Sequence, residues 1–103
     1  MIIVLSSIST GQALASQEKI EIAQQAFQQC QVANLPSVDL DKLDTDAAAL
    51  ELTNLCLDHY EDLVKTLARY KLQTQNERRM FRIDQDSDYA KIDASREVIE
   101  AAR

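Results

Sequence analysis

Apolar residues recur at helical spacing in two long segments of the chain. In residues 17–33 they follow an i, i+3, i+7, i+10 pattern, which is typical of one face of a helix. Residues 45–73 carry a longer apolar stripe with the same period. Asp44 or Thr45 is placed to cap it, because a side-chain oxygen there can accept a free backbone N–H. The two stripes consist of Ile20, Ala23, Phe27 and Cys30, and of Leu52, Leu55, Cys56, His59, Leu63, Leu67 and Tyr70.

The remaining sequence predicts a connecting loop and at least one further helix. Pro36 prevents the first helix from continuing, and the apolar residues of 34–44 favour a loop that packs on the domain. Residues 76–84 either continue the second helix or form a bend. Ser87 or Asp88 can cap a last helix that runs to the end of the chain. The apolar residues are Leu35, Val38, Leu40 and Leu43 in the loop, and Tyr89, Ile92, Ile99 and Ala102 in the last helix.

Composition supports an all-α fold. The chain has one Gly and one Pro, and so few turn residues among many good helix formers favour helices over strands. We therefore predict one domain over residues 16–103, built as a small helical bundle. Its expected architecture is a helical hairpin closed by a disulfide, with a C-terminal helix packed across it.

Residues 1–15 have the layout of a secretory signal peptide. A short apolar run precedes Ala13-Leu14-Ala15, which supplies small residues where a signal peptidase cleaves. The run is too short for a membrane span, which takes about 20 apolar residues. No Lys or Arg follows Met1 before the cleavage site, so the basic n-region is missing or truncated. Either translation starts upstream or the signal is atypical. The alternative is a short structural segment of a cytoplasmic protein.

Cys30 and Cys56 lie on the two predicted apolar stripes. An exported protein with an even number of cysteines is expected to pair them, so we predict a disulfide within the chain. A disulfide needs Cα atoms within about 7 Å of each other. The second helix must therefore pass the end of the first, while loop 34–44 climbs beside it. In a cytoplasmic protein the same residues would be buried free thiols.

Cys30, Cys56 and His59 form an alternative set of metal ligands, with Asp58 or Asp62 as a fourth. The i, i+3 spacing of Cys56 and His59 suits zinc or copper. No C-x-x-C pair or second histidine accompanies it, so we predict no metal and no cofactor. A Cys–His hydrolase would need an orienting third residue and an oxyanion hole. We therefore predict no catalytic residues and no enzyme activity.

A basic segment with interleaved aromatic residues lies at residues 69–82. Its Arg78, Arg79 and Arg82, together with Phe81, are the candidate partner-binding residues. The whole chain carries a net charge of −6, which disfavours binding to nucleic acid or anionic lipid. The expected partner is therefore a protein of unknown identity. The alternative is a solvated helix face that offsets neighbouring aspartates.

The order of these pieces resembles that of small exported two-cysteine helical proteins of Gram-negative bacteria. The matching pieces are the helix end Ala26-Phe27-Gln28-Gln29-Cys30 and a second helix from Ala47-Ala48-Ala49 to Leu55-Cys56. The resemblance implies a leader and an exported helical domain. It implies no activity.

Three functions stay open on the sequence. The first is a periplasmic or secreted, non-catalytic interaction or structural protein, which the leader and the cysteine pair favour. The second is a cytoplasmic helical adaptor or secretion-chaperone-like protein, in which residues 1–15 are structural. The third is a periplasmic metal-binding protein.

Overall fold

Helices make up every regular element of residues 2–103, the part of the chain whose backbone the computed structural model describes; side chains are described from residue 15 onward. The elements are α1 (Ile2–Asn34), a 3-10 turn η1 (Leu35–Ser37), α2 (Thr45–Leu55), α3 (Leu57–Lys71), α4 (Gln75–Gln85) and α5 (Asp88–Ala102). The predicted all-α fold is therefore confirmed. The chain between residues 45 and 85 divides into more helices than the apolar pattern indicated.

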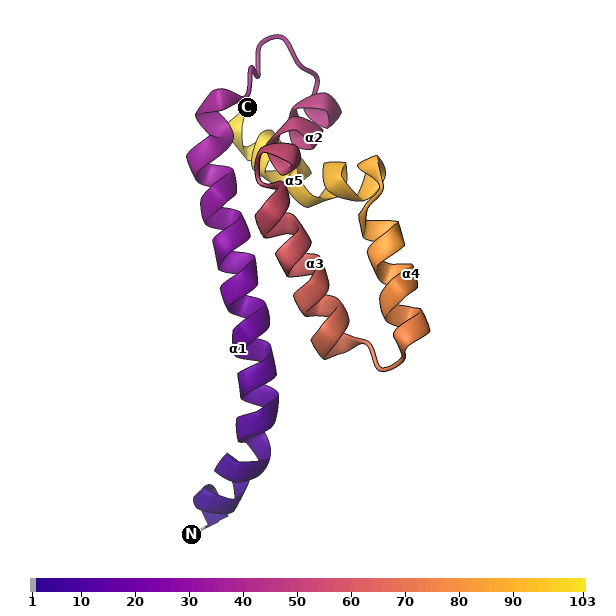
Figure 1. Ribbon diagram of the computed structural model, residues 1–103. Helices are drawn as coiled ribbons and strands as arrows, with labels where there is room; N and C mark the ends of the chain where they lie inside the picture. The colour runs from indigo at the N-terminus through magenta and orange to yellow at the C-terminus, as the bar shows by residue number, and fades with distance from the viewer. Residues whose placement is uncertain (1) are drawn as a thin grey trace.

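Helices α1 and α3 form the predicted antiparallel hairpin (Figure 1). The ring centroids of Phe27 and Tyr60 lie 5.7 Å apart. Further from the closed end, Lys19 Nζ lies 5.9 Å from the ring centroid of Tyr70. Phe27 and Tyr60, together with Cys56 and Val64, form the buried cluster of the hairpin. The apolar stripe of the first predicted helix therefore packs where its period placed it.

Helices α2 and α5 form a second layer across the closed end of the hairpin (Figure 1). Their buried cluster contains small and branched side chains, which let the two helices approach closely. The apolar residues of the loop pack against the same cluster, as predicted. The cluster consists of Val38, Ala48, Ala49, Leu52 and Ile99, with Leu35, Leu40, Leu43, Ile92 and Val98 packed around it.

The predicted single helix over 45–73 is wrong, because the chain bends at Cys56. This residue leaves the helical region, with φ −112° and ψ 28°. Its N–H is shared between the carbonyls of Leu52 and Thr53, at 3.2 and 3.0 Å. The bend directs α2 toward α5 while α3 follows α1. It also breaks the predicted stripe, so that Leu55 and His59 are exposed to solvent.

The predicted N-caps of α2 and α5 are confirmed, but the predicted apolar face of α5 is only partly buried. Asp44 accepts the N–H of Ala47 at 2.8 Å at the start of α2, and Ser87 caps α5. Ile99 is buried, as expected. Tyr89, placed on the same face, is 71% exposed, and Ala102 is also exposed. The buried face of α5 is therefore the one that α2 covers. It includes fewer of the apolar residues than the sequence pattern predicted.

Helix α1 makes the molecule elongated. The Cα radius of gyration is 16.7 Å and the extents are 60 × 31 × 18 Å, whereas a compact chain of this length has a radius of gyration of about 13 Å. In Figure 1 the N-terminal turns of α1 run past the end of α3. The apolar run of the predicted leader lies in residues 2–14, outside the described side chains. Within the described chain, no helix is long and apolar enough to cross a membrane.

Candidate functional site

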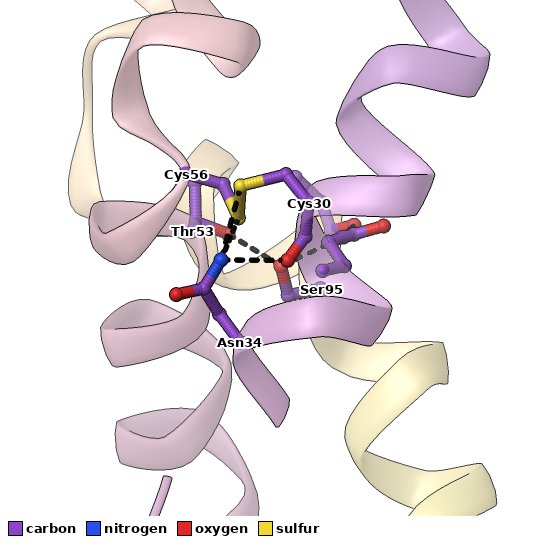
Figure 2. The surroundings of a disulfide bond; sticks show 7 residues. Cys30, Asn34, Thr53, Cys56 and Ser95 are labelled. Carbon is purple, nitrogen blue, oxygen red and sulfur yellow. Dashed lines mark hydrogen bonds between the residues drawn. A yellow bond between two sulfur atoms is a disulfide. The ribbon is translucent and has the colours of Figure 1, made fainter. Parts of the chain in front are cut away.

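The predicted disulfide joins the end of α1 to the bend between α2 and α3 (Figure 2). The Cα atoms of Cys30 and Cys56 lie 5.9 Å apart, and the two residues are separated by 26 positions. Cys56 is only 1% exposed. The side-chain amide of Asn34 donates to the Cys30 carbonyl at 2.8 Å and lies 3.3 Å from the Cys30 Sγ. The disulfide is thus a shielded part of the core rather than a surface bridge.

A buried polar network beside the disulfide ties α1, α2 and α5 together. The Nε2 of Gln31 donates to the Ser95 Oγ at 2.9 Å and to the Ala94 carbonyl at 3.1 Å. The Oγ1 of Thr53 donates to the Lys91 carbonyl at 2.7 Å and lies 2.6 Å from the Ser95 Oγ (Figure 2). No buried side-chain polar atom in residues 15–103 lacks a partner. The network therefore fixes the layer contact without an unsatisfied group, which would cost about 1–3 kcal/mol.

The alternative metal set loses its sulfur ligands in this structure. Cys30 and Cys56 are bonded to each other, and a disulfide sulfur is not the thiolate that zinc or copper binds. His59 is exposed on α3. Among the described residues no cluster of three His, Cys, Asp or Glu side chains is arranged to hold a metal ion.

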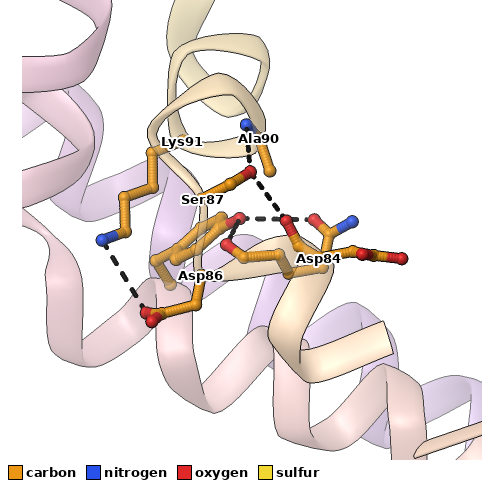
Figure 3. Close-up of polar contacts among 7 residues, drawn as sticks. Asp84, Asp86, Ser87, Ala90 and Lys91 are labelled. Atoms are coloured by element: carbon orange, nitrogen blue, oxygen red, sulfur yellow. Dashed lines mark hydrogen bonds and ion pairs between the residues drawn. The ribbon is translucent and has the colours of Figure 1, made fainter. Parts of the chain in front are cut away.

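The corner between α4 and α5 is closed by a short chain of polar contacts (Figure 3). The Ser87 Oγ donates to the Asp84 carbonyl at 2.8 Å and accepts the Ala90 N–H at 3.2 Å. Lys91 Nζ lies 3.8 Å from the Asp86 carboxylate. One serine therefore serves both the end of α4 and the start of α5, and this fixes the angle at which α4 leaves the domain.

Tyr60 holds the C-terminal end of α4 against α3. Its hydroxyl donates to the backbone carbonyl of Gln85 at 2.6 Å. Burial of the phenol, and next the nearby negative charge of Asp86, raise the pKa of Tyr60 to about 12. The phenol therefore stays a neutral donor at physiological pH.

Helices α3 and α4 enclose a groove of about 700 Å³, and the candidate arginines lie on its wall. Tyr60 and Val64 form its buried floor. Arg78, Arg79 and Arg82 line the α4 side. The arginines are brought together because positions 78 and 82 lie one turn apart on the helix, with position 79 next to them. The basic segment of the sequence is therefore one wall of a concave surface.

The cations of the groove are not neutralised by ion pairs. Lys65 adds a fourth positive charge from α3, facing the three arginines. Within residues 15–103, no carboxylate forms an ion pair with any of these four side chains. Arg78 Nε instead donates to the Leu72 carbonyl at 3.1 Å, and Arg79 lies 3.4 Å from the Asn76 side-chain oxygen.

Phe81, the fourth candidate partner-binding residue, is separated from the arginines. It is half-buried and packs against the hairpin cluster, so it attaches α4 to the domain. Ile83 lines the groove instead and is 58% exposed. The sequence pattern did not indicate Ile83 or Lys65 as residues of this surface. The i, i+4 spacing from Arg79 could have indicated Ile83, whereas Lys65 joins the site only through the packing of α3 on α4.

No protein-family model, curated protein or solved structure matches this chain. Its function is therefore inferred from its own residues and geometry.

Proposed function

We propose that the protein is a small, exported, non-catalytic helical protein that works in an oxidising compartment, the periplasm or the exterior, by binding another protein. The single observation that carries the proposal is the Cys30–Cys56 disulfide, in which Cys56 is buried in the core. A disulfide of this kind persists in oxidising compartments and is rare where thiols are kept reduced. It closes the fold of a short chain, for which the core alone provides limited stability.

The register of the α1–α3 hairpin supports removal of residues 1–15. Lys19 lies beside Tyr70, and α3 ends one residue later, at Lys71. An antiparallel partner that ends there cannot accompany α1 far beyond Ser16. Cleavage after Ala15 would therefore leave the paired part of α1 intact. Ser16 is also a residue type that caps a new helix end, and Glu18 follows in its first turn, where a negative charge is favourable.

The positions of the cysteines, the histidine and the groove cations favour a binding role over a catalytic one. Both cysteines are used in the disulfide, and the one histidine of the chain, His59, is exposed on α3. A nucleophile–base pair of cysteine and histidine is therefore not formed. The groove between α3 and α4 offers a concave surface with cations free of ion pairs, and such a surface suits recognition.

One observation favours the cytoplasmic alternative, an adaptor or secretion-chaperone-like protein. Helix α1 runs without interruption from Ile2 to Asn34, through the predicted cleavage site. A continuous helix is what a structural N-terminal segment would form. In that case the disulfide would be absent in the cell and residues 1–15 would be retained.

Intact-mass analysis of the protein from its native host separates the two proposals. Thiols are blocked with an alkylating reagent at the moment of lysis. We expect a chain that begins at Ser16, carries no alkyl group and gains two after reduction. A chain that retains residues 1–15 and carries two alkyl groups would overturn export and favour the cytoplasmic adaptor. A chain with Cys30 bonded to a second copy would refute the disulfide as the closure of the hairpin.

A further inference from the structure

We propose that the groove between α3 and α4 binds an acidic helical segment of a partner protein. This inference rests on the proposed function, because it assigns the surface and the partner chemistry through which an interaction protein would act. The proposal is carried by the charge of the groove, its shape and its exposed apolar residue.

The groove concentrates positive charge on an acidic protein. The chain carries a net charge of −6, yet Lys65, Arg78, Arg79 and Arg82 face one groove that contains two carboxylates, Glu61 and Asp86. Asp86 is already engaged by Lys91. The four cations form no ion pair within the described side chains. Their field is therefore complementary to a ligand with several negative charges.

The shape of the groove favours a helix as the ligand. Helices α3 and α4 run antiparallel (Figure 1), and residues of both helices line the groove. Helix α4 has 11 residues, which corresponds to roughly 16 Å, or three turns. Arg78 and Arg82 lie one turn apart, so carboxylates at i and i+4 of a third helix would match their spacing. The ligand would complete a local three-helix arrangement.

The apolar contact of the docked helix would be Ile83. This side chain is 58% exposed on the wall that also carries Arg79. A leucine or similar residue beside the carboxylates of the ligand would cover it, as in other helix-in-groove complexes. The remaining contacts are between exposed charges, so binding should be modest in affinity and sensitive to salt.

The same features disfavour a membrane or a nucleic acid as the ligand. A lipid surface is flat on the scale of this domain and would reach the rim but not the groove between the helices. The net charge of −6 on the whole chain opposes both anionic bilayers and polynucleotides, because their charge extends well beyond the groove. A short acidic segment interacts with the groove alone.

Fluorescence anisotropy with a defined probe tests the assignment on the protein in the form, cleaved or full-length and oxidised or reduced, that its native host contains. The probe is a labelled helical peptide of roughly 14 residues with Glu at i, i+4 and i+8 and Leu on the adjacent positions. A peptide with Gln in place of Glu is its control. Arg82→Glu is compared with Lys42→Glu, which reverses the same charge on an exposed residue of the segment between η1 and α2, outside the groove.

We expect the Glu peptide to bind, the Gln peptide to bind far more weakly, and added salt to weaken the complex. Arg82→Glu should reduce affinity roughly tenfold, whereas Lys42→Glu should change it less than about twofold. Circular dichroism checks that both variants are folded. Equal losses in the two variants, or no binding of the Glu peptide at low salt, would overturn the proposal. So would tighter binding to phosphatidylglycerol vesicles or to a single-stranded oligonucleotide.

Failure of this proposal is distinguishable from failure of the proposed function. A cleaved, oxidised native protein with a groove that ignores the Glu peptide would refute the groove and leave export standing. A full-length, reduced native protein whose groove still binds the Glu peptide would refute export and leave the groove standing.

Discussion

Helices α4 and α5 are neighbours with similar local signals and opposite degrees of burial. Each begins with a side-chain cap: Thr74 accepts the Glu77 N–H at 3.1 Å, and Ser87 accepts the Ala90 N–H at 3.2 Å. Helix α5 buries Ser95 and Ile99 against α2. Helix α4 buries no residue completely.

The difference shows that the local signals that form a helix do not determine whether that helix is buried in the core. Caps and helix formers specify both segments locally, whereas tertiary burial provides most of the stability of a helix in a folded protein. Helix α5 belongs to the core layer. Helix α4 is attached by Phe81 and by the Tyr60–Gln85 hydrogen bond, and it presents its charged side to solvent. Variants in α4 and in α5 distinguish an exposed surface that is available for binding from a helix that stabilises the core.

The largest effect is expected from the disulfide, which connects the α2–α5 layer to α1. A closed loop of 26 residues is worth up to about 3.5 kcal/mol in the chain-entropy model. We expect a Cys30→Ala, Cys56→Ala double variant to lose most of this free energy of unfolding and many degrees of melting temperature. Urea denaturation of oxidised wild type, reduced wild type and the double variant checks the result. Three coincident transitions would show that the disulfide does not brace the layers.

The next effect compares two isoleucines. Ile99 is 0% exposed on α5, and Ile83 is 58% exposed on α4. Ile99→Ala should reduce the free energy of unfolding by about 2–4 kcal/mol, because it leaves a cavity in the layer contact. Ile83→Ala should change it by less than about 0.5 kcal/mol. Chemical denaturation of the two variants provides the measurement, and equal losses would contradict the different roles of the helices.

Local periodicity predicted the elements that depend on neighbours in sequence. Ile20, Phe27 and Leu52 lie on helical stripes and are buried. Asp44 and Ser87 are oxygen-bearing residues at helix starts, and both cap. The disulfide could be predicted because its two residues are the only cysteines of the chain.

Features that depend on packing between helices could not be predicted. No Gly or Pro marks the bend at Cys56, which arises where α2 and α3 must follow different partners. Gln31 has the residue type of an exposed surface position. It is buried and donates to Ser95 only because α5 packs against α1 at this point. The shape of the groove could not be predicted for the same reason. The arginines form a cluster in the sequence, but only the packing of α4 turns Phe81 inward and Ile83 outward, and partner binding by these residues stays a prediction.

A smaller effect, dependent on pH, tests the attachment of α4 by Tyr60. In the folded protein the pKa of Tyr60 is raised to about 12, whereas the tyrosine of an unfolded chain has its ordinary pKa of 10.0. Between these values the unfolded state binds fewer protons than the folded state, so the free energy of unfolding should fall as pH rises from 10 toward 12. The total loss is on the order of 3 kcal/mol, and this contribution is constant only below about pH 9, where the phenol is protonated in both states.

Denaturant unfolding at a series of alkaline pH values measures this decline. Tyr60→Phe should lose the part of the decline that belongs to Tyr60 and should be about 1 kcal/mol less stable at neutral pH, because the Gln85 carbonyl loses its donor. Tyr89→Phe, on an exposed residue, is the matched control and should retain the decline. If Tyr60→Phe declines as steeply as wild type, ionisation of the buried Tyr60 phenol does not cause the alkaline loss of stability.

The smallest effects are expected from removing the N-caps of α4 and α5. Ser87→Ala removes the acceptor for the Ala90 N–H and the donor to the Asp84 carbonyl, and it should reduce the global free energy of unfolding by about 1 kcal/mol. Thr74→Ala removes an equivalent acceptor from α4, but α4 buries no residue completely and can open while the α2–α5 cluster stays packed. Its global cost should therefore be under about 0.5 kcal/mol. Hydrogen exchange should instead become several-fold faster at the α4 amides, while the α5 amides stay protected. Equal global losses, with α4 and α5 exchanging together, would place both helices in one cooperative unit and remove the distinction between them.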